Sequence, residues 1–156
     1  MRVAFGSDHA GFSLKEILKA ELVGLGHDVV DVGTSGAEIS VDYPRFGAAV
    51  GRAVAGGDVD LGVCICGSGN GIAMAANKVP GVRAAVVHDV TTASLARRHN
   101  HANVVCLGSR VVGAIVATEA LIAFLSAPEE GGRHCDRIAQ LARLDRELVH
   151  NSEGTQ

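Results

Sequence analysis

The sequence predicts an α/β protein in which helices cover both faces of a parallel sheet. Five short apolar segments occur at residues 2–6, 27–33, 61–66, 82–87 and 103–107, and each is followed by a stretch with apolar residues at helical spacing. The most apolar of these segments lack the alternation of a half-exposed strand, which indicates burial on both faces. This pattern favours a Rossmann-like three-layer α/β/α sandwich with a five-stranded parallel sheet.

In the first half of the chain, glycine and polar residues mark the ends of the elements. The first strand stops at Gly6, and a helix with regularly spaced apolar residues follows over 12–23. The second strand leads through a polar loop, 34–41, to a helix over 42–55. Pro44 falls in the first turn of that helix, where proline is well tolerated.

The second half continues the alternation of strand and helix. The third strand opens into a glycine-rich loop and a helix that begins near residue 72, and the fourth strand leads to a helix after Asp89. A long helix rich in alanine and isoleucine is predicted over 112–125. A last helix over 133–148 has the apolar stripe of an amphipathic helix.

Composition limits the domain count and the classes of function. The chain has 156 residues, without an internal repeat or linker, so we expect a single domain over 1–148 and a disordered polar tail at 149–156. Aromatic residues make up only 3% and the net charge is −3, which argues against a nucleic-acid partner. The sequence contains neither a membrane-length apolar run nor a signal-peptide pattern, so we expect a cytoplasmic protein without a membrane partner.

Four cysteines occur at positions 64, 66, 106 and 135. Their spacing matches neither a zinc site nor the framework of a disulfide-rich secreted protein, so we expect no metal. Cys64 and Cys106 lie within predicted strands and Cys135 lies within a predicted helix. We interpret these three as packing residues.

The stretch Cys66-Gly-Ser-Gly-Asn-Gly71 is the clearest functional motif. A buried strand delivers the Cys66 thiol to a loop in which Gly67, Gly69 and Gly71 permit positive φ and close backbone approach. Backbone N–H groups in such a loop and at the following helix start favour an anion, and they also favour the thiolate form of a cysteine. The motif therefore predicts an anion site beside a base or nucleophile.

The loop differs from two familiar phosphate-binding motifs. A Walker loop carries lysine directly after its last glycine, whereas Lys78 comes seven residues after Gly71. The dinucleotide motif has a later third glycine and follows the first strand, whereas this loop follows the third. A dinucleotide-binding module, with Asp89 as the ribose ligand, is the weaker alternative.

Polar residues at the ends of other strands extend the candidate site. Ligands of parallel sheets bind where the strands end, and Asp8 and His9 follow the first strand while Arg110 follows the fifth. An Asp at a helix start also suits a capping role, and Asp8 can serve both purposes. These three residues are candidate contacts to a sugar or a phosphate.

A second basic group lies at the start of the last helix. Arg133, His134 and Arg137 occupy the helix end that disfavours cations, which indicates a bound anion, with phosphate as the best match. A solvated charged face is the alternative. His99 and Asn100 end an earlier helix beside two arginines and lead into the fifth strand.

These motifs together resemble the type B ribose-5-phosphate isomerases, a family grouped with the galactose-6-phosphate isomerase subunits. The resemblance spans about residues 1–148. It rests on several ordered motifs: Gly6-Ser-Asp-His-Ala-Gly11, Asp42-Tyr-Pro44, Cys66-Gly-Ser-Gly-Asn-Gly71, Ala75-Ala-Asn-Lys78, Arg97-x-His-Asn100, Gly108-x-Arg110 and Arg133-His-x-x-Arg137.

The resemblance implies an enzyme that interconverts ribose 5-phosphate and ribulose 5-phosphate through a cis-enediolate, without metal or organic cofactor. It implies that Cys66 is the base that moves a proton between C2 and C1, that Ser68 helps to move the proton between O1 and O2, and that Asp8 and His99 assist ring opening. A second subgroup of the family lacks the cysteine and uses a Glu directly after the loop. Ile72 occupies that position here, so the chain resembles the cysteine subgroup.

The resemblance also implies the substrate ligands and the assembly. The implied ligands are Gly67, Gly69, Asn70 and Gly71 for the enediolate, His9, Arg110, Arg133, His134 and Arg137 for the phosphate, and Tyr43 and Asn100 for the sugar. The family implies a homodimer, in some members a tetramer, with sites between subunits to which the partner contributes His99, Asn100 and the Arg133–Arg137 group. An isomerase of allose 6-phosphate, galactose 6-phosphate or a tetrose phosphate would share these residues, and a non-catalytic sugar-phosphate sensor is a further alternative.

Overall fold

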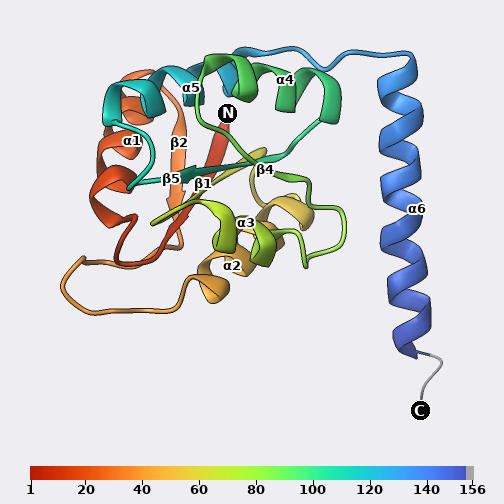
Figure 1. The fold of residues 1–156 in the computed structure, drawn as a ribbon, viewed down its shortest axis with the longest axis horizontal. Coiled ribbons are helices and arrows are strands. Elements are labelled where there is room, and N and C mark those ends of the chain that lie inside the picture. The colour runs from red at the N-terminus through yellow and green to blue at the C-terminus, as the bar shows by residue number, and fades with distance from the viewer. Residues whose placement is uncertain (154–156) are drawn as a thin grey trace.

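A five-stranded parallel sheet lies at the centre of the molecule, with helices on both of its faces (Figure 1). The computed structural model describes residues 1–153, and the side chains of residues 1–147. In chain order the strands are β1 (Arg2–Ser7), β2 (Asp28–Asp31), β3 (Leu61–Cys66), β4 (Ala84–Val86) and β5 (Val104–Gly108), and the helices are α1 (Phe12–Gly24), α2 (Tyr43–Ala55), α3 (Asn70–Ala76), α4 (Val90–Asn100), α5 (Ala114–Ser126) and α6 (Arg133–Glu153).

The strand order is β2-β1-β3-β5-β4, and all pairs are parallel. This arrangement confirms the predicted three-layer sandwich and five-stranded sheet. The strands β2 and β4 are shorter than predicted, and both are edge strands that pair with a single neighbour. An edge strand forms backbone hydrogen bonds to a neighbouring strand on one side only. This limits how many of its residues are held in regular strand geometry.

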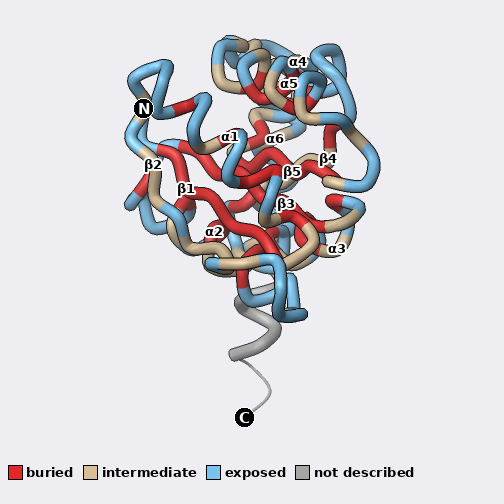
Figure 2. Tube along the Cα trace, turned by 90° about the vertical axis from the view of Figure 1, so that its left-hand side faces the viewer, coloured by how far each residue is buried: buried red, intermediate tan, exposed pale blue. Residues whose placement is uncertain are grey.

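Two hydrophobic cores lie on the two faces of the sheet. On one face α1, α4 and α5 pack on side chains such as Phe5, and on the other α2 and α3 pack on side chains such as Cys64. Successive residues of a strand point to opposite faces, so Phe5 and its neighbour Ala4 belong to different cores. Figure 2 shows that the buried residues concentrate along β1, β3 and β5.

The cysteines predicted to serve packing behave in two ways. Cys64 and Cys106 are fully buried and face each other in register across β3 and β5, which confirms the prediction for both. Burial and the neighbouring Cys64 raise the pKa of the Cys106 thiol, so this group stays protonated. Cys135 is exposed, so its assignment to packing was wrong. It lies on α6, which stands away from the sheet and offers this side chain no core (Figure 1).

Helix α6 runs past the rest of the chain on one side (Figure 1). It meets the body near its start and again where the Gly81 N–H donates to Asp145, at 2.9 Å. Its apolar residues Leu141 and Leu144 are 45% and 55% exposed, so the amphipathic stripe is not covered within this chain. The helix includes residues 149–153 of the segment predicted as a tail, and 154–156 lie outside the described residues.

The described helices were compared with the length and apolar character of a membrane span. None of them, over residues 1–153, combines the length and the apolar character that a membrane crossing requires.

Candidate active site

Cys66 is the last residue of β3, where the strand opens into the glycine loop. Its side chain is 4% exposed, and its sulfur accepts a hydrogen bond from the Gly69 N–H at 3.1 Å. The structure thus places a nearly buried thiol at the edge of the sheet where the strands end, which we call the carboxyl edge.

The three glycines of the loop serve different purposes. Gly69 has a φ of +82° and precedes α3, so it adopts the left-handed conformation that glycine permits. Gly71 has another role, because a Cβ at this position would lie 2.6 Å from the ring of Tyr43. Gly67 faces the guanidinium of Arg110, which a Cβ would approach to 3.5 Å. The loop therefore brings Tyr43 and Arg110 close to Cys66.

Ser68 and Asn70 are exposed at the tip of the loop. The Asn70 N–H donates to the Ser68 hydroxyl oxygen at 3.3 Å. The backbone of Ser68 packs on Gly108, where a Cβ would lie 2.6 Å from the Ser68 carbonyl carbon. This contact holds the loop against the end of β5.

The end of β1 supplies Asp8 and His9 to the same edge. Asp8 is buried and its carboxylate accepts the Gly11 N–H at 2.9 Å, which closes the turn that leads into α1. The Nδ1 atom of His9 accepts the Val41 N–H at 3.1 Å and lies 3.3 Å from the Val41 carbonyl oxygen. This bond fixes the loop that leads into Tyr43.

Ser109 joins the ends of three strands, although sequence reasoning assigned it no role in the site. Its hydroxyl donates to the carbonyl oxygen of Ala10 at 2.8 Å and lies 3.3 Å from that of Cys66. The only signal in the sequence is its place directly after the fifth strand. Ser109 supports the site by holding the turn after β1 against β3.

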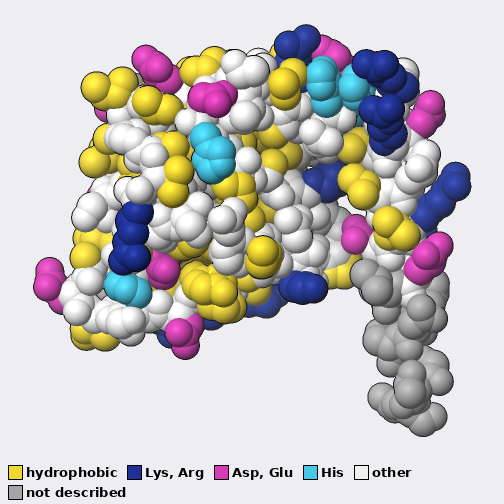
Figure 3. Space-filling model, in the orientation of Figure 1, with side chains coloured by type: hydrophobic (Ala, Val, Ile, Leu, Met, Phe, Trp, Pro, Cys, Tyr) yellow, Lys and Arg dark blue, Asp and Glu magenta, His cyan; other side chains and the backbone are white. Residues whose placement is uncertain are grey.

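A second group of predicted site residues lies where α4 ends and α6 begins. The imidazole rings of His99 and His134 stack with their centroids 4.3 Å apart and their planes at 9°. The Glu130 carboxylate faces both rings and also accepts hydrogen bonds from Arg98. Figure 3 shows histidines beside basic side chains near the start of α6.

The charges of this group shift two titrating side chains. The hydrogen bond from Arg98 lowers the pKa of the Glu130 carboxyl, which is therefore ionised at neutral pH. Burial lowers the pKa of His134, and the positive charges of His99 and Arg133 lower it further, while Glu130 acts in the opposite direction. A further anion would be attracted to this group of cations.

The two groups of predicted residues lie at opposite edges of the sheet. In a parallel α/β sheet each helix runs back against the strands, so the end of α4 lies at the edge where β5 begins, the amino edge. The carboxyl edge carries Asp8, His9, Tyr43, Cys66, Gly67, Ser68, Gly69, Asn70, Gly71 and Arg110. The amino edge carries His99, Asn100, Arg133, His134 and Arg137. The six residues of β3 span about 20 Å, so one chain does not bring the two groups together.

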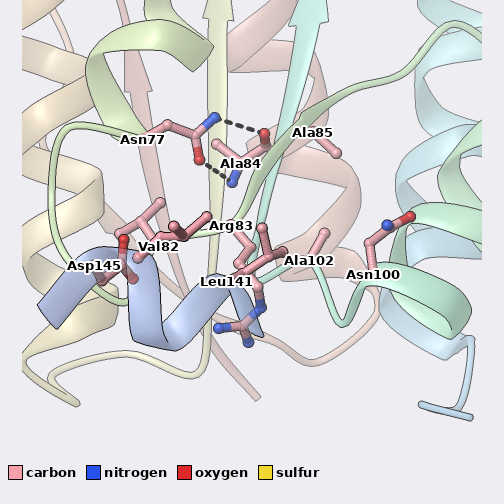
Figure 4. Close-up of a pocket in the computed structure, with 10 residues that line it drawn as sticks. Asn77, Val82, Arg83, Ala84, Ala85, Asn100, Ala102, Leu141 and Asp145 are labelled. Atoms are coloured by element: carbon pink, nitrogen blue, oxygen red, sulfur yellow. Dashed lines mark hydrogen bonds between the residues drawn. The ribbon is translucent and has the colours of Figure 1, made fainter. Parts of the chain in front are cut away.

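A cavity of about 440 Å³ lies at the amino edge, between α6 and the short strand β4. Figure 4 shows Asn100, Ala102 and Leu141 around it, near the beginnings of β4 and β5. Its lining includes Asn100 among the predicted ligands but not Cys66. This cavity is therefore separate from the site around the thiol.

Within the described residues, His99, Glu130 and His134 place potential metal-ligand atoms within 4.8 Å of one another. The two rings are almost parallel, however, so their nitrogen lone pairs point side by side rather than to one centre. One oxygen of Glu130 is also occupied by Arg98. The arrangement fits a carboxylate shared by two imidazoles better than a tetrahedral metal ion.

Comparisons of this chain with known proteins agree on one family. The profile of the family described as Ribose/Galactose Isomerase matches residues 3–141. The chain is 46% identical over 144 residues to ribose-5-phosphate isomerase B of Escherichia coli (strain K12), with 92% of this chain and 96% of the relative covered. It is 45% identical over 148 residues to ribose-5-phosphate isomerase B of Mycolicibacterium paratuberculosis, with 94% of this chain and 92% of the relative covered.

Solved structures agree with the sequence relatives. Ribose-5-phosphate isomerase B of Clostridium thermocellum is similar with a TM-score of 0.93 and 44% identity, over 95% of this chain and 99% of that one. The enzyme from Mycoplasma genitalium, solved with bound ribulose-5-phosphate, gives a TM-score of 0.89 and 44% identity over 94% and 97% of the two chains. The family match, the relatives and the fold point to one conclusion: this chain belongs to the ribose/galactose isomerase family.

Proposed function

We propose that this protein is an aldose–ketose isomerase that interconverts ribose 5-phosphate and ribulose 5-phosphate. The observation that carries the proposal is the position of Cys66, whose sulfur accepts the Gly69 N–H inside a loop that also meets Tyr43 and Arg110. The assignment of the substrate is supported by the relatives, which carry the name ribose-5-phosphate isomerase B at up to 46% identity. One similar structure holds bound ribulose-5-phosphate.

Cys66 is the proposed base of the reaction. Its thiolate removes the proton from C2 of the open aldose and returns it to C1, so the sulfur ends the cycle as it began. The enediolate formed between these steps carries negative charge, which N–H groups of the glycine loop stabilise; each such donor contributes about 3 kcal/mol in other enzymes. The exposed hydroxyl of Ser68, two residues further on, moves the second proton between O1 and O2.

Ring opening precedes this chemistry, because ribose 5-phosphate is mostly cyclic. The ring oxygen must gain a proton as its bond to C1 breaks, and the C1 hydroxyl must lose one. We assign the first transfer to His99 and the second to the carboxylate of Asp8. His9 and Arg110 at the carboxyl edge, and the Arg133–Arg137 group at the amino edge, are the proposed phosphate ligands.

A homodimer with shared sites would unite the two edges. Within one chain the length of β3 separates Cys66 from His99, yet the proposed reaction needs both at one substrate. A second copy could bring its amino edge to the carboxyl edge of the first, and twofold symmetry would then form two equivalent sites. The exposed Leu141 and Leu144 give α6 an apolar face that a partner could cover.

The test is a coupled assay with ribose 5-phosphate, allose 6-phosphate, galactose 6-phosphate and erythrose 4-phosphate. We expect the highest kcat/KM with ribose 5-phosphate. A higher value with a hexose or tetrose phosphate would move the assignment to that substrate. Binding without turnover of any of them would support a sensor instead, and thermal stabilisation by NAD alone would support a dinucleotide-binding module.

A further inference from the structure

The linker between α5 and α6 is fastened to the end of α4 through its two glutamates. The Glu130 N–H donates to the Arg98 carbonyl oxygen at 2.9 Å, and His101 Nε2 donates to the Glu130 carbonyl oxygen at 2.8 Å. The Glu129 carboxylate lies 2.6 Å from Arg97. These contacts fix where α6 begins relative to α4.

The Glu130 side chain occupies the centre of this junction. One carboxylate oxygen accepts hydrogen bonds from Arg98 Nε at 2.8 Å and Nη2 at 2.5 Å. The other oxygen lies 3.4 Å from His99 Nε2 and 3.7 Å from His134 Nε2. One carboxylate therefore faces an arginine and both stacked histidines.

Two stacked imidazoles repel each other when both are protonated, because their centroids are only 4.3 Å apart. The charged side chains around them are Arg98 on α4, Glu130 on the linker, and Arg133 and Arg137 on α6. Among the described side chains, Glu130 is the acid that faces both rings. Its negative charge offsets the repulsion and orients the two Nε2 atoms toward itself.

We propose that Glu130 is a positioning residue, whose carboxylate orients His99 and His134 for the ring-opening and phosphate-binding steps. The inference rests on the proposed function, which assigns His99 as the ring-opening acid and His134 as a phosphate ligand. Both Nε2 atoms face the carboxylate, so the Nδ1 side of each ring is the one turned away from it. Neither the family match nor the names of the relatives assigns this role to Glu130.

The chain offers a matched pair of variants for the test. Glu130→Gln keeps the size of the side chain and the backbone contacts but removes the charge beside both rings. Glu129→Gln is the control, because Glu129 lies in the same linker yet pairs with Arg97 and His101. Thermal unfolding of both variants would establish that each is folded.

The first measurement is the pH profile of kcat/KM with ribose 5-phosphate. We expect Glu130→Gln to lower kcat/KM about tenfold near neutral pH and to move the alkaline limb to lower pH by about 0.5–1 unit, because an imidazolium without its carboxylate loses its proton more readily. We expect Glu129→Gln to leave the limb in place. An unmoved limb in Glu130→Gln, or an equal shift in both variants, would overturn the proposal.

The second measurement needs no turnover. Histidine side-chain NMR of the substrate-free protein should show that Glu130→Gln lowers the pKa of His134 and that Glu129→Gln does not. If this shift occurs in a protein without isomerase activity, the proposed function fails and only the electrostatic effect of Glu130 on His134 stands. If the protein is an active isomerase and the His134 titration does not move, the positioning role fails and the proposed function stands.

Discussion

The Gly69 N–H reaches the sulfur of Cys66 because Gly69 has a left-handed backbone. A residue with a Cβ rarely adopts a φ of +82°, so the donor that faces the thiol depends on this glycine. The relationship links a backbone dihedral angle to the proposed base of the reaction.

Replacing Gly69 by Ala should cost about 1–2 kcal/mol of stability and should also impair turnover, because relief of the strain moves the N–H away from Cys66. The matched control is Gly57→Ala, since Gly57 has a similar φ of +76° with open space around it and follows α2 rather than the site. It should keep its activity and lose somewhat less stability, because a Cβ at position 69 would also lie 3.0 Å from the Leu107 backbone. Thermal unfolding and steady-state kinetics on both variants check this, and equal activity loss in both would contradict it.

Removing the thiol should abolish isomerisation without unfolding the chain. A general base contributes about 10²–10⁴-fold, so we expect Cys66→Ala to lose at least that much in kcat. Cys64→Ala is the control, because Cys64 is a buried thiol on the same face of β3 but lies within the core. Cys64→Ala should lower the unfolding temperature but leave kcat largely unchanged. Near-full turnover by Cys66→Ala would rule out the thiol as base.

The close contact between Gly71 and Tyr43 predicts energetic coupling. A Cβ at position 71 would overlap the Tyr43 ring, so Gly71→Ala should displace that ring and raise KM. Removing the ring makes room, so the Gly71→Ala change should cost less stability in a Tyr43→Ala background. A double-mutant cycle should give a coupling energy of about 0.5–3 kcal/mol. Additive effects would show that the ring does not constrain position 71.

The phosphate assignment of the amino edge can be tested on α6. Arg137→Ala should chiefly raise KM for ribose 5-phosphate, with a fall in kcat if phosphate binding helps to position C2. Arg143→Ala removes an exposed arginine from the same helix outside the predicted phosphate group and should change KM little. Initial-rate kinetics over a range of substrate concentrations separates the two. An unchanged KM in Arg137→Ala would exclude it as a ligand.

Mixed dimers would test whether sites are shared between chains. Cys66→Ala and His99→Asn should each be inactive alone, because every site lacks one group. In a random mixture about half of the dimers are hybrids, and each hybrid holds one complete site out of two, so activity should recover to about a quarter of the unmodified level. The control is a chain that carries both Cys66→Ala and His99→Asn, mixed with either single variant. No hybrid in that mixture holds a complete site, so it should stay inactive. Failure to recover, with hybrid formation shown by native mass spectrometry, would contradict a site that combines Cys66 of one chain with His99 of the other.

Most of the fold was predictable because its signals are local. Runs such as residues 61–66 are apolar enough to be recognised as buried strands, and the glycines after Cys66 mark the loop directly. Asp8, His9, Arg110 and the loop after Cys66 followed from a general property of parallel sheets, whereas Tyr43 came from the family resemblance. The predicted ends of β2 and β4 were less accurate, because a short edge strand leaves only a weak hydrophobic pattern in the sequence.

The parts that could not be predicted depend on contacts distant in the sequence. Glu130 meets Arg98 from 32 residues away, and an acidic pair before two glycines reads as an ordinary solvated loop. Cys135 was misassigned because helical spacing does not tell whether α6 has a core beside it. The stacking of His99 on His134 likewise requires the end of one helix and the start of another to meet in space.

The separation of the two edges by the length of β3 has a consequence for how the protein would be assayed. If catalysis needs groups from two copies, specific activity should depend on protein concentration and fall upon dilution below the dissociation constant of the assembly. Substrate bound across both copies would oppose that loss, since it stabilises the associated form. Enzyme diluted before substrate is added should then start slowly and accelerate as copies reassociate.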